Sequence, residues 1–200
     1  MKMNSLSKLM VIGALTASAA TSNVYAASIS LNPSSSTVTV GSNFTVDLLM
    51  DFSDEGTLGG GLDVNYNSSF ADFNSFTYNS SFLAMSDPFM TCPGAGPCSP
   101  IDQLNTVSNI AFGNFNGIGG IFTIGTLDFT ALNAGSILLS TASTSGLAGP
   151  FVSALTYEEM SVTFNGTSVS SVAAVPVPAA AWLFLSGLGV LGLTRRKNNK

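Results

Sequence analysis

The ten residues NFTVDLLMDF, from Asn43 to Phe52, alternate apolar and polar side chains. One side of an extended chain here carries only apolar groups: Phe44, Val46, Leu48, Met50 and Phe52. Because successive side chains of a β-strand point to opposite faces, the run predicts a strand with one buried face. Leu49 alone breaks the alternation. Such a strand needs a second layer to cover its apolar side.

Similar short runs recur along the chain, separated by Gly, Asn, Pro and Ser. The further predicted strands are SISL (Ser28 to Leu31), STVTV (Ser36 to Val40), LDVNY (Leu62 to Tyr66), ADFNSFTY (Ala71 to Tyr78), NIAFGNF (Asn109 to Phe115), IFTIGTLDFTA (Ile121 to Ala131), SILLST (Ser136 to Thr141) and EEMSVTF (Glu158 to Phe164). Many short strands, each with one apolar face, predict an all-β fold: an antiparallel β-sandwich of about eight or nine strands.

The run from Ile121 to Ala131 changes its apolar parity in the middle. Phe122 and Ile124 stand at even positions, whereas the later apolar residues stand at odd positions. This shift predicts a β-bulge at Gly125. We expect the bulge to bend the strand between the two sheets.

All six basic residues lie near the chain ends, and the sequence contains no His. Between Met10 and Thr194 every formal charge is therefore negative. Nucleic-acid and phosphate binding depend on Lys and Arg, so both are excluded as functions of this region. The usual general bases, Schiff-base lysines and anion clamps are absent as well, which argues against an enzyme.

The first 26 residues have the layout of a signal peptide. Lys2 and Lys8 come first, then the apolar run LMVIGALTASAA, then the small-residue site Val24-Tyr25-Ala26. The apolar run is too short for a membrane-spanning helix, which needs about 20 residues. We expect signal peptidase to cleave after Ala26, so that the domain from residue 27 to residue 171 is exported.

Two cysteines remain in the exported part, Cys92 and Cys98, within TCPGAGPCSP. A Pro/Gly-rich spacer can turn back on itself, and export makes oxidation possible, so a disulfide that staples this loop is the favoured interpretation. Free thiols are the alternative. A zinc site is disfavoured, because two cysteines supply half of the usual ligands.

A second pattern spans Ile29 to Ser145. The order PSSSTVTVGSNFTVDLLMDF, LDVNYNSSFADF and GIFTIGTLDFTALNAGSILLS resembles the cohesin-like domains of bacterial surface and extracellular proteins. The resemblance implies a jelly-roll-like sandwich used for binding or display rather than for catalysis.

Acidic side chains gather in DFSDEGTLGGGLD, which is interpreted as a loop. Its carboxylates are Asp51, Asp54, Glu55 and Asp63. Oxygen ligands without a neighbouring cation suit Ca²⁺, although the spacing does not match an EF-hand. A solvated acidic turn is the alternative, and no other cofactor is expected.

A glycosidase is the remaining enzymatic candidate. Glu158 and Glu159 are adjacent, so on a strand they would point to opposite faces and could not flank one bond. Tyr66, Tyr78 and Tyr157 are able to stack on a sugar, but on a sandwich such residues more often pack against their neighbours.

The tail from residue 172 to residue 200 combines three parts: a Pro motif, an apolar segment (179–194) and a basic end. The charge-free stretch from Ala179 to Leu193 makes a helix of only about 22 Å, against a hydrocarbon core near 30 Å. Including the preceding Pro motif brings it near the length of a span, with the basic end on the cytoplasmic side. The sequence thus predicts one C-terminal transmembrane helix.

This layout resembles the PEP-CTERM sorting signal of Gram-negative bacteria. Val175, Pro176 and Pro178 match its Pro motif, AAAWLF follows, and Arg195, Arg196 and Lys197 close it; Val177 stands where the family usually has Glu. The resemblance implies removal of the tail by an exosortase, after an intermediate anchored in the inner membrane, and delivery to the cell surface or the extracellular matrix. An unprocessed C-terminal anchor is the alternative.

The sequence therefore predicts an exported, non-enzymatic surface or matrix protein, and the resemblance to PEP-CTERM proteins implies an association with exopolysaccharide or biofilm. One alternative is a carbohydrate-binding module for the cell's own exopolysaccharide. The other is a secreted hydrolase, which the charge pattern disfavours.

Overall fold

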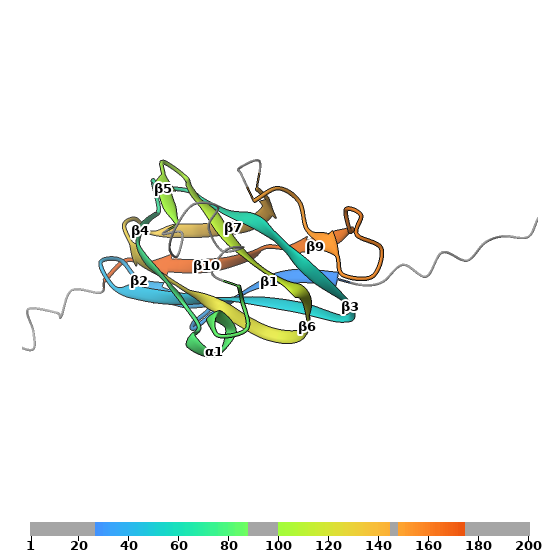
Figure 1. Cartoon of the computed structure of the whole chain (residues 1–200). Helices are drawn as coiled ribbons and strands as arrows, with labels where there is room; N and C mark the ends of the chain where they lie inside the picture. The colour runs from blue at the N-terminus through green and yellow to red at the C-terminus, as the bar shows by residue number, and fades with distance from the viewer. Residues whose placement is uncertain (1–26, 88–99, 145–147, 175–200) are drawn as a thin grey trace, which may run out of the picture.

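The computed structural model describes residues 27–87, 100–144 and 148–174, which form a β-sandwich (Figure 1). The elements are β1 (Ala27–Pro33), β2 (Thr37–Thr39), β3 (Asn43–Tyr66), β4 (Ala71–Tyr78), α1 (Ser80–Leu83), β5 (Ile101–Gln103), β6 (Thr106–Ala131), β7 (Gly135–Ser143), β8 (Val152–Ser153), β9 (Val162–Asn165) and β10 (Thr167–Val172). The predicted all-β sandwich is confirmed, with ten strands in these residues instead of eight or nine.

Two long antiparallel strands, β3 and β6, run through both layers. Residues 43–52 of β3 lie between β1 and the second half of β6, and residues 57–66 lie between β7 and the first half of β6. We call the layer β9-β1-β3-β6-β4 the β1 sheet and the layer β2-β10-β7-β3-β6-β5 the β7 sheet. The β1–β9 and β2–β10 pairs are parallel, so the sandwich is not purely antiparallel.

The segment interpreted as a loop, DFSDEGTLGGGLD, is part of β3, and the predicted strands on either side of it are one strand. Its glycines allow two backbones to come unusually close. A Cβ on Gly59 would lie 2.5 Å from the carbonyl oxygen of Phe112 on β6. The glycines that made the sequence look like a loop are the residues that let β3 pair with β6 at the bend.

The predicted bulge at Gly125 is confirmed. Leu48 pairs with Gly125 and Leu49 with Thr123, so Ile124 is the extra residue. The bend between the sheets, however, lies elsewhere: the β3–β6 register shifts again between Phe52 and Thr57. The bulge lets the apolar side chains of β6 before and after Gly125 face the same side of the sheet. The glycine-rich backbone of β3 and β6 makes the bend.

The core lies between the two sheets. The alternating residues of the opening sequence face inward as predicted, since Phe44, Val46, Leu48, Met50 and Phe52 are at most 3% exposed. Phe129 of β6 stacks on its cross-strand partner Phe44 at a centroid distance of 5.6 Å, and it contacts Tyr66 of the opposite layer at 5.4 Å. Burial of this apolar face accounts for most of the stability of the fold.

Several elements differ from the sequence prediction. The short strands β5, β8 and β10 and the helix α1 were not predicted, and β9 begins at Val162 rather than at Glu158. In α1 the side chain of Asn79 caps the first turn by accepting hydrogen bonds from the N–H groups of Ser81 and Phe82. A single turn of helix has too few residues to show a helical period in the sequence. The two-residue strand β8 is likewise too short to show an alternating pattern.

Five sequence predictions lie outside the described residues: the signal peptide (1–26), the Cys92–Cys98 disulfide, the Pro motif, the transmembrane helix (179–194) and the basic end (195–197). Within the described ranges, no helix is long and apolar enough to cross a membrane. The described chain begins in β1, where Ala27 pairs with Val162 of β9, and leaves the sandwich after β10, where Val172 pairs with Thr39 of β2. These two points lie at opposite ends of the sandwich (Figure 1).

Candidate binding faces

The described residues carry one sign of charge. They contain all eleven Asp and Glu residues of the chain, and the six Lys and Arg residues all lie outside them. Eleven negative and no positive side chains give a formal charge of −11 for this part. Any ligand of the sandwich therefore meets a negative field without a local counter-charge.

The four carboxylates predicted to bind calcium are dispersed. Asp51 lies in the β1 sheet and accepts hydrogen bonds from the Ser53 N–H (3.1 Å) and hydroxyl (2.5 Å), which hold the pKa of Asp51 below its ordinary value. Asp63 lies in the β7 sheet and accepts from the Asn109 N–H at 3.2 Å. Among the described residues, no three His, Cys, Asp or Glu side chains come together as a metal site.

Glu55, the third of these carboxylates, serves a structural contact at the bend of β3. It accepts a hydrogen bond from the hydroxyl of Ser153 on β8. The same hydroxyl also accepts from the N–H groups of Leu155 and Thr156. Glu55 and Ser153 therefore fix the turn that follows β8, while Asp54 is exposed beside them.

Of the three tyrosines in the described residues, Tyr66 is buried, Tyr78 is partly buried and Tyr157 is exposed. Tyr66 and Tyr78 pack into the sandwich, and their hydroxyls donate to Asp102 Oδ1 (2.9 Å) and to the carbonyl of Ala111 (3.0 Å). Burial raises the pKa of each to about 12. Tyr157 is 74% exposed in a turn, with a positive φ of 62°.

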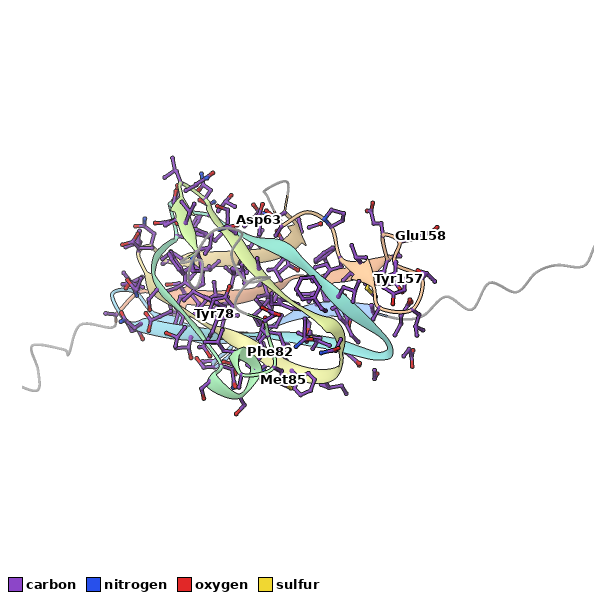
Figure 2. All side chains as sticks on the ribbon, viewed as in Figure 1. Asp63, Tyr78, Phe82, Met85, Tyr157 and Glu158 are labelled. Carbon is purple, nitrogen blue, oxygen red and sulfur yellow. The ribbon has the colours of Figure 1, made fainter. Side chains whose placement is uncertain are left out.

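Glu158 and Glu159 follow Tyr157 in this turn and not on a strand as predicted. Figure 2 shows Tyr157 and Glu158 together at one end of the sandwich, far from Asp63. The turn is held by backbone bonds from Ser153 N–H to the Glu158 carbonyl and from Met160 N–H to the Phe151 carbonyl. Two adjacent carboxylates on an exposed turn do not flank a common substrate bond.

A pocket of about 230 Å³ opens beside this turn, and sequence reasoning did not identify it. Its lining is Ser143, Pro150, Phe151, Glu159, Met160, Ser161, Val162 and Phe164. Glu159 is the only titratable side chain among them. Phe151, one of the lining residues, belongs to the core and packs edge-on against Phe52 at 5.5 Å. With one carboxylate in its lining, the pocket does not present the pair of carboxyl groups that glycoside hydrolysis commonly uses.

The outer face of the β7 sheet carries isolated apolar side chains among short polar ones. Leu138 of β7 is 64% exposed and Ile101 of β5 is 52% exposed. Between them, Ser140 pairs with Asn65, and Asn65 pairs with Thr106. The Thr106 hydroxyl donates to Asn65 Oδ1 at 3.0 Å. This face offers two apolar contact points with small side chains between them.

Comparisons with known proteins show which solved structures have a similar fold. No protein-family model matches the sequence, and no curated protein matches it either. Solved structures do match: a non-cellulosomal cohesin from Archaeoglobus fulgidus has a TM-score of 0.54 and 13% identity, covering 74% of this chain and 91% of that one.

Two further neighbours are bacterial cohesin modules, each 14% identical to this chain. One is the cohesin module of a Clostridium perfringens glycoside hydrolase (TM-score 0.51; 73% of this chain, 98% of that one). The other is the sixth cohesin of scaffoldin B from Acetivibrio cellulolyticus, solved in complex with a dockerin (TM-score 0.50; 72% and 99%). The described residues have the β-sandwich fold of cohesin modules.

Proposed function

We propose that this chain is an exported, non-enzymatic surface protein whose sandwich docks a partner protein on the outer face of the β7 sheet. The observation that carries the proposal is the pair of exposed apolar side chains on that face, Leu138 and Ile101, on a sandwich with the cohesin fold. The dockerin complex of the Acetivibrio cellulolyticus neighbour supports a role in protein binding.

The chemistry of the face suits a protein partner. Binding energy at protein interfaces comes mainly from a few apolar or aromatic side chains that lose water, surrounded by contacts that exclude solvent. Leu138 and Ile101 supply such anchors, and the short side chains of Ser140 and Asn65 between them let a partner backbone approach closely. The charge of −11 favours a partner with a basic surface and speeds its association.

Catalysis finds little support in the described residues. Without His, Lys or Arg they lack the common bases and electrophilic groups, and the pocket beside β9 presents one carboxylate. A binding role needs none of these groups.

Photo-cross-linking in the native host tests the docking face. A photoreactive amino acid replaces Ser140 on the β7 sheet or, as the matched control, Thr45 on the outer face of the β1 sheet. We expect one discrete protein adduct from position 140 and none from position 45, and we expect Leu138→Asp with Ile101→Asp to remove it. Equal adducts from both positions, or an adduct that survives the double substitution, would contradict the proposal.

The ends of the chain direct its localisation in this proposal. The signal peptide leads to export, and the tail, by its resemblance to PEP-CTERM signals, is processed by an exosortase after anchoring in the inner membrane. Replacing Val175 to Pro178 by a Gly-Ser linker leaves the apolar segment and basic end intact. We expect this variant to accumulate in the inner-membrane fraction, whereas release equal to that of the unchanged chain would exclude recognition of the Pro motif.

A further inference from the structure

The outer face of the β1 sheet is a regular array of short polar side chains. Strand pairing aligns them in five rows across the strands: Thr163–Ser28–Asp51–Ile121, Asn165–Ser30–Leu49–Thr123, Asn32–Asp47–Thr126–Thr77, Thr45–Asp128–Ser75 and Asn43–Thr130–Asp72. All of these residues except Leu49 and Ile121 are Ser, Thr, Asn or Asp. We call this array the polar lattice.

Hydrogen bonds between neighbouring strands hold the polar lattice in place. The Thr126 hydroxyl donates to Asp47 Oδ1 at 2.8 Å, and the Thr130 hydroxyl donates to Asn43 Oδ1 at 3.0 Å. Asn74, the bulged residue of β4, donates from Nδ2 to Asp128 Oδ1 at 2.5 Å. Short, already oriented side chains lose little conformational entropy when a ligand binds, unlike the Lys, Arg and Glu of most protein surfaces.

The polar lattice is also anionic. Asp47, Asp51, Asp72 and Asp128 distribute four carboxylates over it, and the described residues provide no cation to neutralise them. Anionic polymers are therefore repelled. The complementary ligand carries positive charges spaced along its length, with hydrogen-bonding groups between them.

A polysaccharide fits this surface better than a basic protein does. Protein interfaces depend on an apolar or aromatic centre, but here Leu49 is half-buried and Ile121 lies in the outermost row. Sugar hydroxyls, in contrast, match the hydroxyl, amide and carboxylate groups of the rows. Neighbouring strands lie about 4.8 Å apart, which is close to the length of one pyranose unit, so a polymer crossing the strands meets new partners at each unit.

We propose that the polar lattice binds an amine-bearing polysaccharide, a hexosamine polymer with free amino groups. The ammonium groups pair with the aspartates, and the sugar hydroxyls bond to Thr, Ser and Asn. No aromatic ring of the lattice stacks on the sugars, so single sugars bind weakly and affinity comes from many units held at once. The polar lattice lies on the β1 sheet, whereas the proposed protein-docking face lies on the β7 sheet. An experiment can therefore disprove polysaccharide binding without disproving protein docking, and the reverse.

The test uses the full-length chain in mild detergent, titrated with a β-1,4-glucosamine oligosaccharide at a pH where its amines are protonated. Asp47→Asn with Asp128→Asn removes two charges from the polar lattice and keeps hydrogen-bonding groups in place. Glu158→Gln with Glu159→Gln removes the same charge from the distant turn. We expect the dissociation constant to rise at least about tenfold for the first variant and to stay within about twofold for the second.

Further ligands separate sugar recognition from simple charge attraction. The fully N-acetylated oligosaccharide and an alginate oligosaccharide are expected to bind at least about tenfold more weakly than the amine form. Oligolysine of equal charge is expected to bind weakly and to respond equally to both variants. Equal losses in the two variants, oligolysine binding as tight as the sugar, or no sugar binding would each overturn the proposal; melting temperatures confirm that the variants are folded.

Discussion

The hydroxyl of Tyr66 on β3 donates a 2.9 Å hydrogen bond to Oδ1 of Asp102 on β5. All three residues of β5 are exposed, and β5 pairs only with β6 in the described part of the chain. The bond therefore joins an exposed edge strand to a side chain that is only 7% exposed. It also means that the outermost strand of the proposed docking face depends on a tyrosine that stays protonated.

This dependence predicts loss of stability at alkaline pH. Tyr66 and Tyr78 have a pKa of about 12 in the folded chain, chiefly because burial disfavours the phenolate, against about 10 when unfolded. From about pH 10 to about pH 12 the unfolded chain therefore binds fewer protons than the folded chain, so the free energy of unfolding falls. Urea denaturation across this range measures the slope.

Tyr78→Phe isolates one contribution to that slope. The variant loses the hydrogen bond to the Ala111 carbonyl and should be destabilised by about 1–3 kcal/mol near neutral pH. Its stability should nevertheless fall less steeply above pH 10. Tyr157→Phe, at an exposed position, is the control for the hydrogen-bond loss and should change the free energy of unfolding near neutral pH by less than about 0.5 kcal/mol. If the stability of Tyr78→Phe fell with pH as steeply as that of the unchanged chain, burial of Tyr78 would not be the cause of the alkaline loss of stability.

A methyl group at Gly125 should disturb the bulge of β6. Its Cβ would lie 2.5 Å from Cζ of Phe76 and 2.6 Å from the Thr77 carbonyl oxygen on β4. We expect Gly125→Ala to cost about 1–3 kcal/mol in the free energy of unfolding, because backbone and a packed ring must shift. Gly119→Ala, whose Cβ would meet its nearest atoms at 3.4 Å, should cost clearly less. Equal costs in chemical denaturation would show that the bulge is not tightly packed.

The helix α1 attaches to the sandwich through one side chain. Phe82 is 1% exposed and contacts Phe112 at a centroid distance of 5.0 Å, whereas its neighbour Leu83 is 38% exposed. Figure 2 shows Phe82 beside Met85 on this flank of the molecule. Phe82→Ala should cost about 3–5 kcal/mol, and Leu83→Ala should cost under about 1 kcal/mol. Similar costs for the two would mean that α1 does not anchor through Phe82.

Calcium should have no effect on the described part of the chain. Asp51 and Asp63 lie in different sheets, and Glu55 is engaged by Ser153. A ligand that binds the folded chain raises its melting temperature, so this dispersal of the carboxylates predicts equal melting temperatures in millimolar calcium and in chelator. A rise that Asp54→Asn abolishes would restore the calcium hypothesis.

Local side-chain patterns predicted much of this fold. The alternation from Phe44 to Phe52 placed the core face of β3 correctly, and the parity change around Gly125 located the bulge. The continuity of β3 was missed because a glycine run favours loops locally, and only the approach of Phe112 on a distant strand makes the same residues fit a sheet. Long-range contact decided the structure there, and no local pattern records it.

The candidate sites were harder to predict than the strands. Asp51 and Asp63 are close in sequence, but the bend of β3 sends them to different sheets. The polar lattice could not be predicted from the sequence, because its rows combine residues from five strands that are far apart in the chain. Sequence indicates which residues face outward on each strand, whereas strand order decides which of them become neighbours.

The proposal of an exported domain that is freed from its tail is tested most directly by the intact mass of the mature protein from its native host. We expect a chain that begins at Ala27, the first residue of β1, and ends near Pro178. A mass that includes residues 1–26, or one that extends to Lys200, would contradict it.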